Sequence, residues 1–121
     1  MVTDAVVAVL STASPEHGLC PSGPHHLLTW AGVDPRNGRY FVNYETVAVG
    51  LGAFVDRDGF DAVRTLASGS ANLPVEALEH AYPLRVERYA LRDGSGGHGC
   101  FRGGNGVVRD YRVLGEDVTV S

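Results

Sequence analysis

Two stretches of apolar periodicity in the 121-residue chain predict short helices. Residues 2–13 repeat apolar side chains at the i, i+3, i+4, i+7 and i+8 positions of an amphipathic helix. The apolar face of that helix comprises Val2, Ala5, Val6, Val9 and Leu10. A second helix is predicted from Pro74 to about Tyr82, because proline suits the first helical position and Pro83 prevents the helix from continuing.

Strand patterns occupy much of the rest of the chain. Residues 27–33 and 39–44 predict two strands of a β-hairpin, because the segment between them contains Asn37-Gly38, a pair that suits the positive φ values of a hairpin turn. Residues 44–53 predict a strand that runs into a loop. Residues 60–68 fit either a helix or a strand.

The C-terminal third adds a second pair of strands. Residues 84–91 and 106–114 alternate with period two, and they predict paired strands on either side of a glycine-rich turn. Residues 118–120 predict a last short strand. The predicted fold class is therefore α+β: a β-rich mixed module with two short helices and glycine-rich turns, formed as a single module by residues 1–121.

Composition excludes several kinds of chemistry. All ten basic residues are arginine, so this chain contains no P-loop lysine, no Schiff-base lysine and no Ser-x-x-Lys nucleophile. Two cysteines are too few for a disulfide framework or a four-cysteine zinc site. No segment approaches the roughly 20 apolar residues that a membrane span needs. The first residues also lack the basic flank of a secretory signal, so we expect a cytoplasmic protein.

The stretch RDGSGGHGCFRGGNGVVR, residues 92–109, has two interpretations. Its backbone amides could form an anion-binding concavity, with Arg92, Arg102 and Arg109 available for bidentate contacts. Alternatively, its glycines serve only the geometry of a tight connection between strands. Either way, we expect a positive φ in at least one of the three glycines at positions 94, 97 and 104.

Two ligand classes are disfavoured for the same stretch. Residues 94–99 fit the pattern G-x-G-x-x-G, but the following residues do not begin the helix that a dinucleotide site requires. Phe101 is the lone aromatic residue in the turn, which gives poor support to a stacking platform for nucleic acid. We therefore expect neither a nucleotide cofactor nor a nucleic-acid partner for this chain.

Linked motifs in residues 72–114 resemble the C-terminal part of the hydantoinase B/oxoprolinase family. The matching segments are Pro74-Val75-Glu76, Arg85-Val86-Glu87-Arg88-Tyr89, the turn at 92–99 and Phe101 to Gly106. Upstream, Gly32-Val33-Asp34-Pro35 and Tyr44-Glu45-Thr46 are similar to further segments of that family. The resemblance covers nearly the whole chain and identifies it as the tail of a longer B-type subunit.

The resemblance implies an ATP-dependent hydrolase of cyclic amides. An A-type ATPase subunit would supply ATP and phosphorylate the carbonyl oxygen of the ring, and the B-type subunit would complete ring opening with water. The resemblance implies that Arg92, Arg102 and Arg109 stabilise the phosphate and the developing oxyanion, with Glu45 as an acid or base. It places the divalent metal in a region that this chain does not contain.

Other functions remain open at this point. The chain could be a catalytically inactive remnant or a module that only binds another subunit, and it could form a homo-oligomer. The apolar stripe at residues 2–13 predicts an exposed patch that would favour such association. The substrate could be oxoproline, a hydantoin or a ketone.

Overall fold

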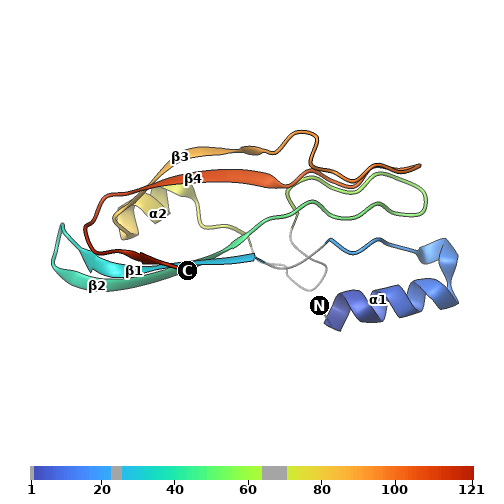
Figure 1. Ribbon diagram of the computed structural model, residues 1–121, viewed down its shortest axis with the longest axis horizontal. Helices are drawn as coiled ribbons and strands as arrows, with labels where there is room; N and C mark the ends of the chain where they lie inside the picture. The colour runs from blue at the N-terminus through green and yellow to red at the C-terminus, as the bar shows by residue number, and fades with distance from the viewer. Residues whose placement is uncertain (1, 23–25, 64–70) are drawn as a thin grey trace. The chain divides into compact units, whose positions relative to one another are not determined.

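The structure is a computed structural model that describes residues 2–22, 26–63 and 71–121 (Figure 1). In chain order, the elements are helix α1 (Val2–Ala13), the 3-10 turn η1 (Pro15–His17), strands β1 (His26–Asp34) and β2 (Arg39–Val47), helix α2 (Val75–Ala81), and strands β3 (Leu84–Leu91), β4 (Val107–Val113) and β5 (Thr119–Val120). The α+β class predicted from the sequence is confirmed, because the strands form two antiparallel sheets alongside two helices. In the described segments, no helix is long and apolar enough to cross a membrane.

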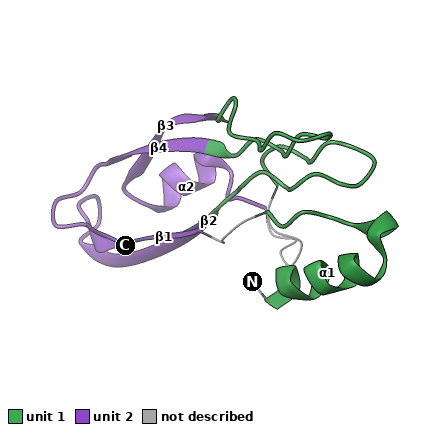
Figure 2. Cartoon of the chain, turned by 45° about the vertical axis from the view of Figure 1, so that its right-hand side comes forward, with its two compact units in different colours: residues 1–25, 47–70, 91–107 green, residues 26–46, 71–90, 108–121 purple. Residues whose placement is uncertain are grey.

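The chain divides into two compact units, and each unit takes three segments that alternate along the sequence (Figure 2). Unit 1 comprises residues 1–25, 47–70 and 91–107, and unit 2 comprises residues 26–46, 71–90 and 108–121. The prediction of a single module over residues 1–121 stays a prediction.

Unit 2 begins with the predicted hairpin. Strands β1 and β2 form a three-stranded sheet with β5, in the order β2-β1-β5, and Trp30 of β1 lies opposite Val120. In the connecting turn only Gly38 has a positive φ, of 69°, so Asn37 does not take the second such position that a two-residue turn would need. The loop is closed instead by Gly38, whose amide donates to the carbonyl oxygen of Asp34 at 2.8 Å.

The Asp34 side chain fixes this turn to α2. Asp34 is 3% exposed, and its carboxylate accepts hydrogen bonds from the backbone amide of Arg36 at 2.9 Å and from Nη2 of Arg36 at 2.7 Å. The Arg36 guanidinium holds the pKa of Asp34 below its usual range. Nη1 of Arg36 donates to the carbonyl oxygens of Glu79 and His80, where the end of α2 leaves carbonyls without helical partners.

The core of unit 2 lies between its two sheets and α2. Trp30 of β1, Phe41 of β2 and Leu84 of β3 are buried together, and Leu78 of α2 has no exposed surface. Side chains that pack around this cluster are Leu28, Tyr82, Tyr111, Val113 and Val118. The opposite face of β2 is open, with Tyr40, Val42 and Tyr44 exposed, as the alternation of side chains along a strand requires.

Strands β3 and β4 confirm the prediction made for residues 84–91 and 106–114. They pair as a two-stranded sheet, although β4 is one residue shorter at each end than its pattern predicts. Helix α2 is joined to β3 through Glu79, whose Oε1 accepts a hydrogen bond from the amide of Val86 at 2.9 Å. This contact and the Arg36 contacts hold α2 to both sheets of the unit.

Unit 1 contains helix α1 and irregular loops. The predicted helix over residues 2–13 is confirmed, but none of its residues is buried. Loop segments in 47–63 and 91–107 bond to one another, for example through the amide of Gly104, which donates to the carbonyl oxygen of Leu51 at 2.8 Å. Of the ambiguous segment 60–68, residues 61–62 form a turn, Val63 forms an isolated bridge with Val49, and residues 64–68 lie outside the described residues.

Candidate functional site

A buried charged cluster forms in unit 2 where the inner faces of β2 and β4 carry polar residues. Glu45 follows Phe41 and Asn43 at every second position of β2, so it shares their buried face. Arg109 and Tyr111 are likewise two residues apart on β4 and point to one side of that strand. The core packing of unit 2 therefore brings three polar side chains into a site that is largely closed to water.

The cluster is built around the Glu45 carboxylate. Arg109 donates from Nη1 to Oε1 of Glu45 at 3.0 Å, and the Tyr111 hydroxyl donates to Oε2. The Glu45 side chain is 7% exposed and the Arg109 side chain 4% exposed, so this ion pair is desolvated on both sides. Both carboxylate oxygens are occupied, and Glu45 in this state serves to orient Arg109 and Tyr111.

Aromatic rings enclose the guanidinium of Arg109. Its Cζ atom lies 4.8 Å from the centroid of the Tyr89 ring and 5.2 Å from that of Tyr111. Tyr111 in turn meets Trp30 edge to face, with 4.6 Å between ring centroids. Burial, followed by the hydrogen bond to Glu45 and its negative charge, raises the pKa of Tyr111 well above its usual range. Tyr111 is therefore a neutral hydrogen-bond donor at physiological pH.

Arg102 occupies a second cluster, in unit 1. Its Nη1 donates to Oδ1 of Asp61 at 3.0 Å, and the same oxygen accepts a hydrogen bond from the backbone amide of Asn105 at 2.6 Å. The Asn105 amide and then the Arg102 guanidinium lower the pKa of Asp61. The backbone amide of Arg102 also donates to Asp58 at 2.7 Å. Two aspartates thus pin the glycine-rich turn to the loop at 58–61.

Close backbone approaches explain many of the glycines in this loop cluster. A Cβ atom on Gly50 would lie 1.7 Å from the carbonyl oxygen of Gly104, and one on Gly104 would lie 1.9 Å from that of Phe60. A Cβ on Gly96 would lie 2.0 Å from the carbonyl oxygen of Gly103. Gly94 has a φ of 72°, which confirms the expectation of a positive φ among the predicted glycines. These observations support the interpretation of residues 92–109 as a tight connection.

The four residues predicted for catalysis fall into both units. Glu45 and Arg109 are in direct contact in unit 2. Arg102 lies in unit 1, paired with Asp61. Arg92 is exposed in unit 1, where its backbone amide donates to the carbonyl oxygen of Gly106 and its guanidinium forms no ion pair with a described residue. Among the predicted residues, the structure therefore brings Glu45 and Arg109 together.

Tyr111 and Asp61 are among the members of these clusters that were not predicted. Tyr111 carries a signal in the sequence, because it lies two positions after Arg109 in a strand pattern and so shares its face. Asp61 carries none, because its partners are a backbone amide and an arginine in another loop. Within the segments that the structure describes, no group of three or more His, Cys, Asp or Glu side chains could hold a metal ion.

Comparison with known proteins connects these clusters to a family. The family described as hydantoinase B/oxoprolinase matches residues 1–121. The putative B subunit of a D-/L-hydantoinase from a Pseudomonas species is 33% identical over 115 residues, covering 95% of this chain and 19% of that relative. The beta subunit of caprolactamase from Pseudomonas jessenii is 36% identical over 124 residues, covering 98% of this chain and 21% of that relative.

A third relative is larger still. The 5-oxoprolinase of Dictyostelium discoideum is 44% identical over 78 residues, which cover 64% of this chain and 6% of that protein. The chain thus spans about a fifth of the length of the two relatives named as subunits and a smaller share of this enzyme.

Proposed function

Since this chain belongs to the hydantoinase B/oxoprolinase family, we propose that it forms part of the B-type subunit of an ATP-dependent hydrolase that opens cyclic amides. The observation that carries the proposal is the family match over all 121 residues. The names of the relatives support it, since they describe a hydantoinase, a caprolactamase and a 5-oxoprolinase.

The proposed chemistry divides the work between two subunits. An amide carbonyl is a poor electrophile, and phosphorylation of its oxygen converts that oxygen into a good leaving group. We assign the ATP step to an A-type partner, because a chain without lysine has no P-loop lysine. Two relatives are named as subunits, which supports a partner of this kind. In the B-type subunit, water would then add to the phosphorylated carbonyl carbon, and the C–N bond of the ring would break as the ring nitrogen takes up a proton. A second water would release inorganic phosphate from the acyl phosphate that this step leaves.

Within this chain, the proposed contributions differ between the arginines. Arg109 is pre-oriented by Glu45 in a desolvated setting, where a cation acts strongly on a developing negative charge. Arg92 is exposed, and its guanidinium forms no ion pair with a described residue, so it is available to bind an oxyanion of the substrate. Arg102 holds the loop cluster in shape through Asp61. Glu45 acts as a positioning residue while both its oxygens are occupied.

A chimera tests whether the chain supports turnover. Residues 1–121 would replace the matching segment of the Pseudomonas hydantoinase relative, and the product would be purified with that enzyme's partner subunit. We expect ATP-dependent ring opening, measured as phosphate release and ring-opened product. A variant of the chimera with Arg92→Lys should assemble equally and turn over more slowly. Assembly without turnover, where the parent enzyme is active, would overturn the proposal.

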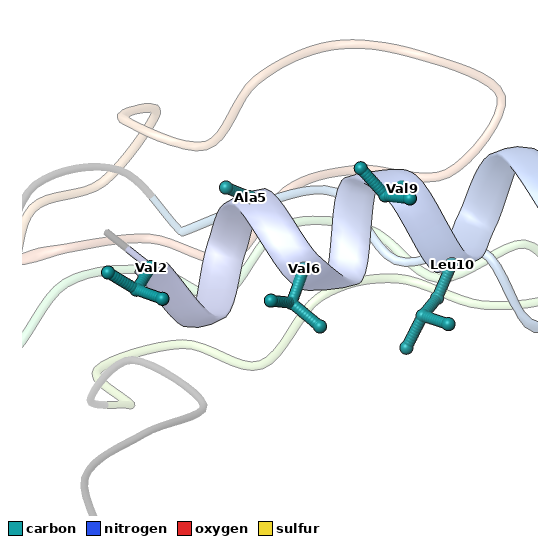
Figure 3. Close-up of a pocket in the computed structure, with 5 residues that line it drawn as sticks. All are labelled: Val2, Ala5, Val6, Val9 and Leu10. Atoms are coloured by element: carbon teal, nitrogen blue, oxygen red, sulfur yellow. The ribbon is translucent and has the colours of Figure 1, made fainter.

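An interaction module without activity is the second candidate. The apolar face of α1 favours it: Val2 is 80% exposed and Val9 70% exposed, and the side chains of Val2, Ala5, Val6, Val9 and Leu10 lie along an uncovered helix surface (Figure 3). The matched segment of the caprolactamase relative belongs to a polypeptide about five times as long. We assign the remainder of a B-type subunit as the polypeptide that covers α1. A chimera that assembles but does not turn over would support this candidate.

A further inference from the structure

Strand β2 forms one edge of its sheet and carries apolar side chains on an open face. The sheet has the order β2-β1-β5, and no described segment pairs with the outer side of β2 (Figure 1). Tyr40 and Tyr44 are each 70% exposed, and Val42 between them is 55% exposed. An edge of this kind offers unpaired N–H and C=O groups to a further strand.

The hydrogen bonds of β1 show which residues of β2 face this edge. Thr29 of β1 and Ser121 exchange both backbone hydrogen bonds, at 2.8 and 3.0 Å, on the β5 side of β1. Because successive residues of a strand direct their backbone groups to opposite sides, those of Trp30 point toward β2. Trp30 is buried, so the residue opposite it on β2 belongs to the buried row that includes Phe41 and Asn43.

The other row of β2 is therefore the one whose backbone groups point to the free edge. It comprises Tyr40, Val42 and Tyr44, whose side chains also cover the open face. Edge strands that stay unpaired in natural proteins are commonly very short or protected by charged residues or proline. Strand β2 is nine residues long and contains no proline, and these three side chains are uncharged. This edge thus lacks the usual protection against pairing.

The outward row is the same in both directions along the strand, namely Tyr, Val, Tyr at alternate positions. Two copies can therefore pair antiparallel about a two-fold axis at Val42, with identical contacts from each copy. Each Tyr40 then lies opposite Tyr44 of the second copy, and Val42 lies opposite its own equivalent. Opposite residues in this row exchange both backbone hydrogen bonds. Aromatic pairs across antiparallel strands are stabilising, and no like charges meet in this row.

The opposite edge of the sheet limits the assembly to two copies. Strand β5 comprises only Thr119 and Val120, and so short a strand is a poor template for pairing. A two-fold pairing occupies the β2 edge of both copies at once. No second long edge then remains in this sheet to extend the assembly into a filament.

We propose that the β2 edge binds a second copy of this chain and joins the two sheets into one continuous antiparallel sheet. The pairing uses residues of unit 2 and does not rest on the proposed function. An interface made of one strand edge from each copy lies below about 1,200 Å², in the class of weak and reversible contacts. We therefore expect a dimer of micromolar affinity that dissociates on dilution.

Two measurements on the intact 121-residue chain test the pairing. Sedimentation equilibrium should show mostly monomer at about 1 μM and mostly dimer at about 1 mM. The amides of Tyr40, Val42 and Tyr44 should gain protection from hydrogen exchange at the higher concentration, because only the dimer supplies their acceptors. A monomer at every concentration would overturn the proposal, and so would a dimer without added protection at these three amides.

Charge variants locate the interface. Val42→Lys places two like charges opposite each other at the two-fold axis, so the dissociation constant should rise at least about tenfold. Val33→Lys is the matched control, because Val33 is 50% exposed on the same open face but belongs to the central strand β1, and the dissociation constant should stay unchanged. Trp30 fluorescence shows that each variant is folded. A dimer that survives Val42→Lys, or an equal loss in Val33→Lys, would place association on another surface and refute the pairing.

Cysteine cross-linking tests the register. Cys20 and Cys100 are free and exposed, so both are first replaced in the variants Cys20→Ser and Cys100→Ser. In this background, Val42→Cys brings two thiols together at the axis, where the Cα atoms would lie about 5.5 Å apart, a separation that a disulfide spans. Mild oxidation should yield a covalent dimer with Val42→Cys and none with Val33→Cys. Equal yields from the two variants, or none from either, would contradict the two-fold pairing.

Discussion

Neutralising Glu45 should destabilise unit 2 far more than neutralising a surface carboxylate. The Glu45→Gln substitution keeps the side-chain shape and an acceptor for Tyr111, but it leaves Arg109 as a cation that is only 4% exposed. At 3.0 Å and an effective dielectric constant near 20, the lost attraction between the two charges is about 5 kcal/mol. Part of this loss is offset, because the variant no longer has to bury a charged carboxylate. We therefore expect unfolding free energy to fall by about 3 kcal/mol.

Removal of the arginine instead of the carboxylate should lower the free energy of unfolding by as much or more. Arg109→Met leaves the Glu45 carboxylate buried with the Tyr111 hydroxyl as its remaining partner, and we expect a loss of about 3–5 kcal/mol. In the double variant neither charge is left alone, so the combined loss should be smaller than the sum by about 1.5–3 kcal/mol. This coupling, rather than either single value, measures the interaction between the two side chains.

Trp30 makes the experiment specific to unit 2. It is the single tryptophan of the chain, is 2% exposed and lies 4.6 Å from the Tyr111 ring, so its fluorescence in urea reports the unfolding of this core. Glu87→Gln is the matched control, since Glu87 pairs with Arg112 at 2.9 Å on the surface and should lose no more than about 1 kcal/mol. The reasoning would be refuted if Glu45→Gln lost no more free energy of unfolding than this control and if the losses of the two single variants added up to that of the double variant.

Three further outcomes follow from other contacts. Gly104→Ala should lower the free energy of unfolding of unit 1 by about 2 kcal/mol or more, because its Cβ would lie 1.9 Å from a carbonyl oxygen. Gly97→Ala is the control: its Cβ would have no atom within 4 Å, and the free energy of unfolding from thermal denaturation should change by less than about 0.5 kcal/mol. The pKa of Tyr111 is raised in the folded state, so the stability that its neutral hydroxyl contributes is complete below about pH 10 and is lost as the pH rises further. The free energy of unfolding measured from about pH 8 to 11 should show this loss. The Tyr111→Phe variant should not show it. The pKa of Asp61 is lowered in the folded state, so the Asn105 amide that it binds should stay protected from hydrogen exchange above about pH 4. This protection should fall as acid protonates Asp61 in the folded chain. The Asp61→Asn variant should show weaker protection without this pH dependence.

Local patterns predict the regular elements of this chain well. The helix at 2–13 and the strand at 84–91 have the same bounds in the structure as in the pattern, because side-chain periodicity directly reflects which face is apolar. The turn before Gly38 is harder to predict, since the Gly38 amide closes it on the Asp34 carbonyl oxygen and the Asp34 carboxylate binds Arg36, in place of the two-residue geometry that Asn-Gly suggests. Periodicity contains no information about such contacts.

The candidate site shows a different limit. Glu45 and Arg109 were both identified as residues of interest, but their contact joins positions 64 residues apart, and no local pattern encodes such a pair. A charged residue on a strand is ordinarily assigned to the solvated face. Here, the Glu45 carboxylate and the Tyr89 and Tyr111 rings enclose the arginine, which is a property of three strands together. The burial of Arg109 follows from that arrangement and could not be foreseen from composition.

The alternation of the two units along the chain constrains how the protein can fold during synthesis. Unit 1 needs residues 91–107, and the sheet of unit 2 gains β5 only when residues 119–120 have emerged. Contacts between such distant segments raise the contact order and slow folding relative to a helical domain of equal size. No cut at a single peptide bond can release either unit intact. Protease nicking in a loop should therefore leave fragments that stay associated rather than two independent domains.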